Sequence, residues 1–194
     1  DRLRRDHPRA TPHELIERLT RGYLRRAAVG GGAIGAVAAV PAIGTVAAAA
    51  LTGGQTLSFL SASAGYVLAV ARIHGIEVEH PARRRTLVLA ALLGKDGPRA
   101  VEGQLGLGTL AWGRAAIGRL PLGTVRSVNT TLGRRLVRAG ATRIGGLALG
   151  RLAPFGIGAV IGWTGGRALG RRVVEGVRAS FGEPPAEVPD LIRA

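Results

Sequence analysis

Apolar residues along this chain recur three and four positions apart, as on one face of a helix, and alternating runs never exceed a few residues. The pattern is clearest over residues 11–26, where arginines occupy the opposite face. This spacing predicts helices rather than strands, and hence an all-α fold. The apolar face of this first helix consists of Leu15, Ile16, Leu19 and Tyr23.

The start of that helix carries a capping signal. Thr11 is a good N-cap residue, Pro12 suits the first helical position, and Glu14 stands three residues after the cap. We therefore expect a capping box at Thr11 and Glu14.

Charge disappears in the next segment, because no Asp, Glu, Lys or Arg occurs from Ala27 to Ala71. Pro41 and the pair Gly53-Gly54 are expected to interrupt it, which leaves a helix over residues 55–71. Three interpretations stay open: a buried helical hairpin in a soluble bundle, a hairpin that spans a membrane, and a reversible membrane-associated state. If the hairpin spans, the flanking arginines place both of its ends on the cytoplasmic side.

The rest of the chain predicts short helices divided by glycine and proline. They are expected over residues 82–93, closed by Gly94, and then over 99–120, 122–138, 141–152 and 165–181, with a linker at 77–81 and a loop at 95–98. The whole reads as one domain, 11–182, a bundle of short amphipathic helices around a central Ala/Gly-rich helical hairpin. A flexible segment, 1–10, precedes it, and a proline-rich acidic tail, 183–194, follows it.

Composition points to an unusual core. The 194 residues include 31 Gly but only three Phe, two Trp and two Tyr, so the core must consist of small side chains between closely spaced backbones. The absence of cysteine excludes disulfides and thiolate metal sites.

The formal net charge is +15, and Lys95 is the only lysine. A coding bias toward Ala, Gly and Arg explains arginine over lysine, but it does not explain the absence of Asp and Glu from Gly103 to Val174. One interpretation is that these arginines only form solvated helix faces. The other is that a segment with so much positive and no negative charge binds an anionic partner: lipid headgroups, nucleic acid or an acidic protein. We predict anion or lipid-headgroup contacts for Arg134, Arg135, Arg138, Arg171 and Arg172.

Motifs that resemble those of enzymes occur in this chain, but the residues around them do not provide the structural context that such sites need. The glycines of residues 30–35 match a dinucleotide fingerprint, but a helical segment and not a strand precedes them. Residues 61–65 only faintly resemble a nucleophile elbow, and the four histidines lack metal-ligand spacing. We assign no catalytic residue, metal or cofactor, and we favour a protein that is not an enzyme.

One motif occurs twice: residues 41–54 read PAIGTVAAAALTGG and residues 154–166 read PFGIGAVIGWTGG. Neither copy follows a strand, as a phosphate loop does, so we interpret both as helix corners where proline sets the bend and glycine lets backbones touch. We expect Gly44 and Gly158 to lie at close contacts between helices. In one arrangement they contact each other. The residues assigned to this structural motif are Pro41, Gly44, Thr45, Pro154, Gly158 and Gly162.

The order of these pieces resembles the EcsC family of bacterial proteins, in an actinobacterial-looking version. The resemblance covers most of residues 10–182 and rests on the capped first helix, Pro41-Ala42-Ile43-Gly44-Thr45, the acidic stretch after Gly75, and the later Pro154, Ile157-Gly158-Ala159 and Ile161-Gly162. The extra Gly156 departs from the family's pattern. The family is named from an operon that also encodes an ABC transporter, so the resemblance implies a helical, membrane-linked protein, without established catalytic residues.

Charge and resemblance together predict a function. We expect a protein at the cytoplasmic face of the cell membrane, peripheral or partly inserted, that binds anionic lipid and is accessory to a transporter. A membrane or transporter protein is then a second partner. The alternatives are a basic nucleic-acid-binding protein and a small-molecule or lipid pocket among the glycine-rich helices of residues 30–70 and 154–166.

Overall fold

The structure is a computed structural model that describes the backbone of residues 2–38, 45–105, 113, 117–118, 120–150 and 157–189. Within these ranges the chain is helical and contains no strand, which confirms the all-α prediction. The helices are α1 (Arg2–Asp6), α2 (Pro12–Ala38), α3 (Thr45–Ile73), α4 (Pro81–Leu92), α5 (Asp96–Leu105), α7 (Leu122–Gly150) and α8 (Ile157–Phe181).

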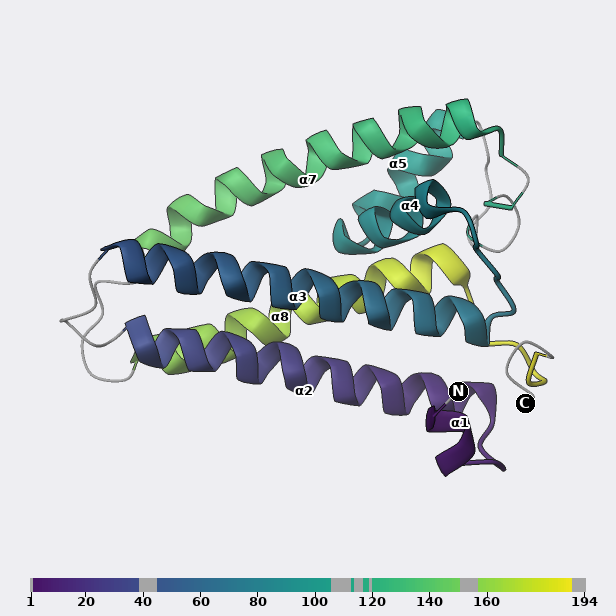
Figure 1. Ribbon diagram of the computed structural model, residues 1–194, viewed down its shortest axis with the longest axis horizontal. Coiled ribbons are helices and arrows are strands. Elements are labelled where there is room, and N and C mark those ends of the chain that lie inside the picture. Colours follow the sequence, from purple (N-terminus) through teal and green to yellow (C-terminus); the bar gives the residue numbers. More distant parts are fainter. Residues whose placement is uncertain are drawn as a thin grey trace.

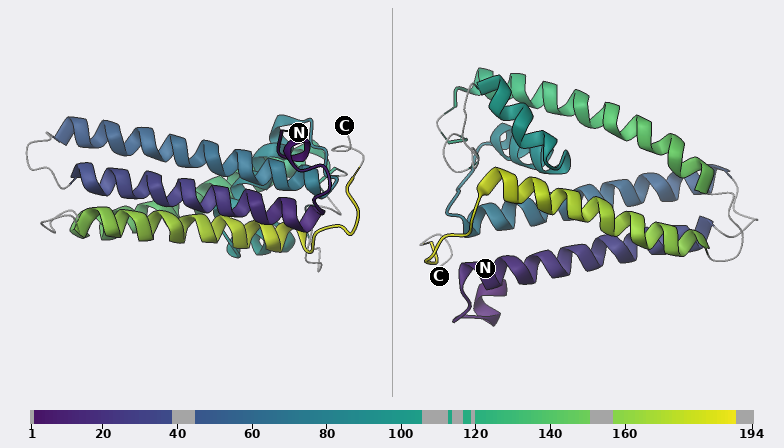
Figure 2. Two further views of the ribbon diagram at one scale, coloured as in Figure 1. Left: turned by 90° about the horizontal axis from the view of Figure 1, so that it is seen from below. Right: turned by 180° about the vertical axis from the view of Figure 1, so that it is seen from behind.

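The long helices α2, α3, α7 and α8 run along the long axis of the molecule (Figure 1). Helices α2 and α7 finish, and α3 and α8 begin, at the same end, which we call the distal end. The chain termini, α1, α4 and α5 lie toward the opposite end, which we call the terminal end (Figures 1 and 2). The described parts of the two copies of the repeated motif, residues 45–54 of α3 and 157–166 of α8, therefore both lie at the distal end.

Local chemistry at the start of α2 is as predicted. The backbone N–H of Thr11 donates to Oε2 of Glu14 at 2.9 Å, and the backbone N–H of Glu14 donates to Oγ1 of Thr11 at 3.3 Å. This reciprocal pair confirms the capping box.

Several helices are longer than the sequence predicts. Gly53 and Gly54 lie inside α3, α7 continues through residues 139–141, and α8 begins at Ile157 instead of at 165. Helix α5 begins at Asp96, inside the expected loop. Glycine in a helix costs only about 1 kcal/mol relative to alanine, and a helix that already exists needs no new nucleation to continue. These glycines therefore do not end their helices.

Glycines do end helices where the backbone turns left-handed. Gly94 has a φ of 68°, and its N–H donates to the carbonyl of Ala91 at 3.0 Å, which confirms the predicted end of α4. Gly75 follows α3 in the same conformation, with a φ of 73°.

The main core lies where α2, α3, α4, α7 and α8 converge. Val67, Leu87, Leu132, Val173 and Phe181 are each at most 1% exposed and belong to one cluster. Large side chains therefore hold this part of the bundle together.

Helices α2 and α8 make the most extensive helix contact, and they do so through glycine and alanine. A Cβ placed on Gly31 would overlap the carbonyl oxygen of Gly162, and a Cβ on Gly166 would overlap that of Ala27. The two backbones therefore touch, as the small-residue composition predicts.

This contact decides part of the motif assignment. Gly162 lies at a close helix contact, but its partner is Gly31 in the first glycine run. Thr45 is the first residue of α3, and Gly158 lies in the first turn of α8. Pro41, Gly44 and Pro154 lie outside the described residues, and so does the expected contact between Gly44 and Gly158.

Helices α2 and α3 form the Ala/Gly-rich hairpin and meet through a buried polar network. The rings of Tyr23 and Tyr66 stack with centroids 4.6 Å apart. The Ser63 hydroxyl donates to the carbonyl of Phe59 at 2.7 Å, so the Tyr23 hydroxyl donates to Ser63 Oγ at 2.8 Å. The Thr20 hydroxyl likewise donates to the carbonyl of Ile16 at 2.8 Å, so the Tyr66 hydroxyl donates to Thr20 Oγ1 at 2.9 Å.

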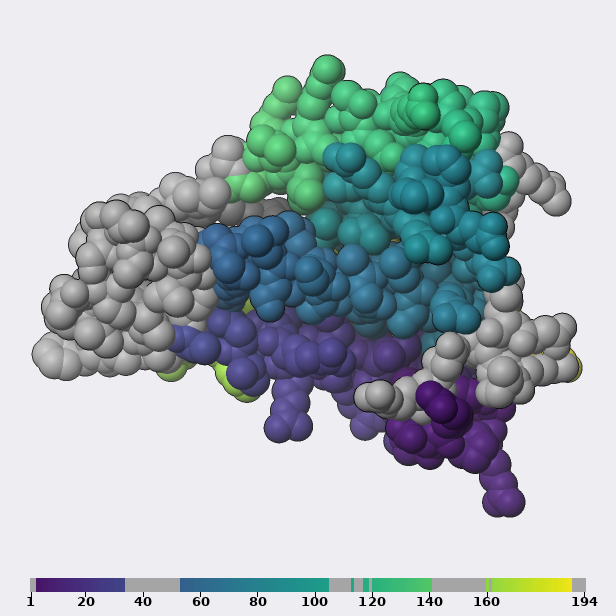
Figure 3. Space-filling view, viewed as in Figure 1, coloured from purple at the N-terminus to yellow at the C-terminus, as the bar shows by residue number. Residues whose placement is uncertain are grey.

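Helix α3 is uncovered along one side. Figure 3 shows it at the surface, between α2 and the layer formed by α4 and α7. Leu57 on this helix is 67% exposed. An apolar helix therefore lies against the bundle with one face open.

A second polar contact joins α4 and α7. The Thr86 hydroxyl donates to Oδ1 of Asn129 at 2.9 Å, and Nδ2 of Asn129 donates to the carbonyl of Ala82 at 2.9 Å. Both side chains are buried, so this pair fixes the register of α7 on α4.

Candidate membrane-facing surface

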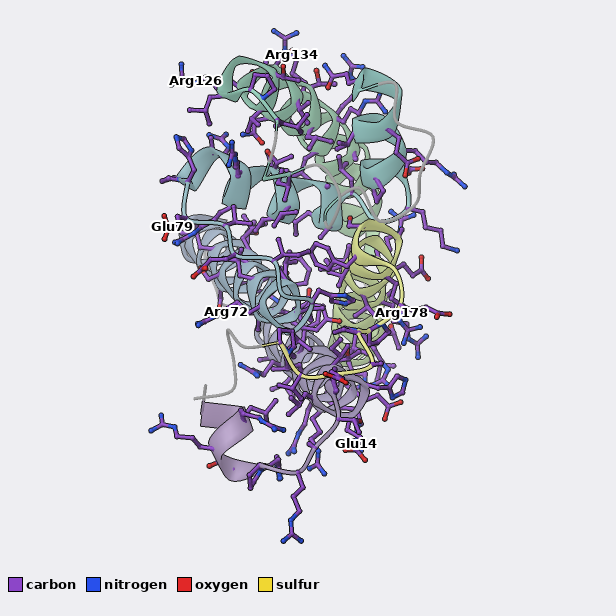
Figure 4. The ribbon with its side chains drawn as sticks, turned by 90° about the vertical axis from the view of Figure 1, so that its right-hand side faces the viewer. Glu14, Arg72, Glu79, Arg126, Arg134 and Arg178 are labelled. Carbon is purple, nitrogen blue, oxygen red and sulfur yellow. The ribbon has the colours of Figure 1, made fainter. Side chains whose placement is uncertain are left out.

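Three of the predicted arginines lie together on α7. Arg134, Arg135 and Arg138 are exposed, whereas Val128 and Leu132 on the same helix are buried. Figure 4 shows Arg134 projecting from α7 away from the other helices. No acidic residue occurs on α7, so nothing on the same helix neutralises these guanidinium groups.

The other two predicted arginines, Arg171 and Arg172, are exposed on α8, opposite the buried Val173 and Val177. Glu175 is exposed one turn further along. Helix α4 packs against both α7 and α8. The structure therefore exposes all five predicted arginines but places them on two separate helices.

The α2–α8 register brings further arginines to the same height. Because Gly31 faces Gly162 on an antiparallel helix, Arg26 lies level with Arg167. Arg26 and Arg138 lie about 18 Å from the distal ends of α2 and α7, and Arg167 about 15 Å from that of α8, at 1.5 Å per residue.

We call this set the arginine band: Arg25, Arg26, Arg134, Arg135, Arg138, Arg167, Arg171 and Arg172. The sequence shows that Arg25 and Arg26 flank the uncharged stretch. Only the contact of Gly31 on α2 with Gly162 on α8 shows that they lie level with Arg167.

Beyond the arginine band, α2, α3 and α8 carry no charged residue as far as their distal ends. We call this part the uncharged end: residues 27–38 of α2, 45–59 of α3 and 157–166 of α8 contain no Asp, Glu, Lys or Arg. On α7, Arg143 lies closer to the distal end, and in the sequence Arg151 directly follows the last residue of this helix.

The uncharged end exposes large apolar side chains on three helices at nearly one height. Val29 is 50%, Leu57 67% and Trp163 43% exposed. The hydrogen bond between Tyr23 and Ser63 sets α2 against α3 so that Leu57 lies level with Val29, and the α2–α8 contact sets Trp163 within one residue of that height. Sequence reasoning identified the missing charge but not this ring, because its members are far apart in the chain.

The other candidate sites are weaker. A cavity of about 290 Å³ lies between α1, α2 and α3 at the terminal end. The alternative function, a small-molecule or lipid pocket, was expected elsewhere, between the glycine-rich segments. Ser63 lies within α3, where its hydroxyl bonds to Tyr23 and Phe59. Within the ranges that the structure describes, no three His, Asp or Glu residues gather as metal ligands do.

Comparison with known proteins adds no relative: no protein-family model, curated protein or solved structure matches this chain. The resemblance to the EcsC family therefore stays a prediction. Among the described helices, the segment Gly53–Ile73 is long and apolar enough to cross a membrane, and 33% of an 18-residue stretch within it is buried in the bundle.

Proposed function

We propose that this protein is a peripheral protein of the cytoplasmic membrane face that binds anionic lipid headgroups through the arginine band and catalyses no reaction. The observation that supports this most is α7, which presents Arg134, Arg135 and Arg138 on an open face without any acidic residue. A guanidinium group binds phosphate with two parallel hydrogen bonds, which suits lipid headgroups.

The expected strength follows from the number of arginines. Each basic residue near an anionic bilayer contributes about 1 kcal/mol. The three on α7 then contribute about 3 kcal/mol, or roughly a hundredfold in affinity. Because the Debye length is about 8 Å at physiological ionic strength, salt should wash the protein from the membrane.

The resemblance to the EcsC family supports the same membrane location. On this resemblance we extend the proposal to an accessory role beside a transporter, with a membrane protein as second partner. Binding to a purified transporter in the absence of lipid tests that extension separately.

Co-sedimentation with vesicles tests the lipid proposal. Phosphatidylcholine vesicles with and without phosphatidylglycerol are compared over a salt titration. Replacing Arg134, Arg135 and Arg138 together by glutamine should weaken binding to the anionic vesicles roughly a hundredfold. A control triple with the same loss of charge uses exposed arginines at the terminal end: Arg5, Arg9 and Arg99.

The outcomes separate the alternatives. A large loss in the α7 triple and a small one in the control triple supports the proposal. Equal losses mean that only net charge matters, and binding to neutral vesicles of equal strength contradicts the headgroup proposal. Tighter binding to duplex DNA than to anionic vesicles at the same salt establishes the nucleic-acid alternative instead.

A further inference from the structure

We propose that the cavity between α1, α2 and α3 binds a fatty acid, a single alkyl chain with an anionic carboxylate at one end. The cavity lies at the terminal end, and its described lining contains no residue of the arginine band or of the uncharged end. This inference therefore goes beyond the proposed function and does not depend on it. It adds a binding site and the chemical class of its ligand.

The cavity forms where α1 folds back onto the start of α2 and the end of α3. Its apolar lining comes from Leu3 of α1, Leu15 and Leu19 of α2, and Leu68 and Ile73 of α3. Leu15 and Ile73 are 2% and 6% exposed, whereas the other three side chains are partly exposed. The cavity therefore has a buried apolar floor and opens to solvent at its rim.

Positive charge lies beside this apolar lining. Arg4 of α1 and Arg72 of α3 also line the cavity, and the described lining contains no acidic residue. Nη1 of Arg4 donates to the carbonyl of Ala10 at 2.7 Å, and Ala10 belongs to the same small core cluster as Leu15 and Ile73. This bond holds the Arg4 guanidinium at the cavity and uses one of its five N–H donors, so an anion can bind the others.

The apolar lining and the arginines together select an amphiphilic anion. An apolar chain displaces water from the leucine and isoleucine side chains, while a carboxylate at its end accepts charge-assisted hydrogen bonds from Arg4. A fatty acid carries both groups and is ionised at neutral pH. An alcohol of the same length would lack the ionic contact, and a cation would be repelled by Arg4 and Arg72.

The volume of the cavity sets the length of the chain. It is about 290 Å³. An apolar cavity of about 150 Å³ holds benzene, so this cavity, with about twice that volume, holds roughly twelve carbon atoms. Each methylene group that enters should tighten binding about fourfold until the cavity is full. Affinity should therefore rise from octanoate to dodecanoate and level off for longer chains.

Ligand binding should also hold α1 in place. This helix has five residues, and so short a helix is not stable by itself. It is held by Leu3, which packs against the cluster that contains Leu15, and by the bond from Arg4 to Ala10. A chain that fills the cavity adds contacts to Leu3 and Arg4, so it should slow tryptic cleavage after Arg4 and Arg5.

Calorimetric titration of the 194-residue chain tests the site. Octanoate, decanoate and dodecanoate are added below the concentrations at which they form micelles, with decanol and decyltrimethylammonium as the neutral and cationic probes. Arg4→Gln is compared with Arg5→Gln, which removes the same charge from an exposed residue outside the lining. Ala69→Phe fills the cavity, because Ala69 lines it.

The proposal predicts that decanoate binds about tenfold more tightly than decanol, that Arg4→Gln weakens decanoate binding about tenfold, and that Arg5→Gln leaves it nearly unchanged. Ala69→Phe should abolish decanoate binding while its helical circular dichroism stays that of the parent chain. Equal losses in Arg4→Gln and Arg5→Gln contradict the proposal, because decanoate then responds to net charge alone. Undiminished binding in a folded Ala69→Phe, or decanol that binds as tightly as decanoate, contradicts it as well.

Proteolysis of the parent chain is a readout that needs no substitution. Decanoate should protect α1 from trypsin, as followed by mass spectrometry of the released N-terminal peptides, whereas decanol at the same concentration should protect it less. Cleavage after Arg4 and Arg5 at the same rate with and without saturating decanoate contradicts a ligand in this cavity.

The source of the chain is tested with decanoyl lysophosphatidylglycerol, which carries the same chain on a phosphate headgroup. If it binds more tightly than decanoate and Ala69→Phe abolishes its binding, the ligand is a membrane lipid and the free fatty acid is wrong. Ala69→Phe should leave salt-sensitive binding to anionic vesicles unchanged, because the arginine band is intact. If the parent chain does not bind anionic vesicles, only the proposed function is wrong; if decanoate does not bind, only this inference is wrong.

Discussion

Replacing Gly166 by alanine should push α2 and α8 apart, whereas the same replacement at the neighbouring Gly165 should not. A Cβ on Gly166 would overlap the carbonyl oxygen of Ala27 and lie 3.3 Å from Cα of Gly31. Both obstacles are helix backbone, which no side-chain rotation can relieve. A Cβ on Gly165 meets nothing within 4 Å.

The magnitude comes from two opposing effects. Each replacement removes a helical glycine and should stabilise the fold by about 1 kcal/mol. Gly166→Ala must in addition separate the helices by roughly 1 Å, which loses part of the contact energy along the whole α2–α8 contact. Overpacking of this kind costs about 1–3 kcal/mol. Gly166→Ala should therefore be less stable than Gly165→Ala by about 2 kcal/mol.

Urea unfolding followed by helical circular dichroism measures that difference, and thermal unfolding should show a gap of about 4–8 °C between the two variants. Because the chemical change and the gain in helix propensity are the same at both positions, their difference reports the packing alone. If Gly166→Ala proves as stable as Gly165→Ala, the backbones of α2 and α8 do not touch in solution, and the register that defines the arginine band is wrong.

Two further predictions concern the buried polar networks. Burial raises the pKa of Tyr23 to about 12, against the lowering effect of its hydrogen bond with Ser63. Unfolded tyrosine ionises near pH 10, so the folded state holds a proton that the unfolded state releases, and stability should fall between about pH 10 and pH 12. Tyr23→Phe should make that fall shallower in unfolding curves measured over this range. Asn129→Ala should cost about 1–3 kcal/mol in urea unfolding, because it removes the bonds to Thr86 and Ala82, and Asn129→Asp should cost more at neutral pH than in acid. Equal stability of Asn129→Asp at both pH values would show that the side chain is not buried.

Local chemistry made part of the fold predictable. Thr11 and Glu14 mark the start of α2 because their hydrogen bonds need only one another, and Gly94 marks the end of α4 because its backbone turns left-handed. Gly53 and Gly54 were expected to break a helix, but glycine alone is only a weak breaker. Whether it ends a helix depends on contacts that a linear pattern does not contain.

The candidate surface was predictable to a similar extent. The apolar stripes of α7 and α8 face the core, and the five arginines for which anion contacts are predicted are exposed. Arg26 and Arg167 lie at the same position along the bundle axis because Gly31 contacts Gly162, and these two glycines are far apart in the chain. No local signal specifies such a register, and the same is true of the ring formed by Val29, Leu57 and Trp163.

The contact between Gly31 and Gly162 also has a consequence for synthesis on the ribosome. Translation proceeds at about 5–20 residues per second, so α2 leaves the ribosome roughly 10 s before its partner α8 does. During that interval the α2–α3 hairpin is complete, apolar and without the helix that covers its glycine face. Closure of the bundle must therefore wait until α8 has been synthesised, and a nascent hairpin of this kind is where a chaperone or the membrane surface would first meet the chain.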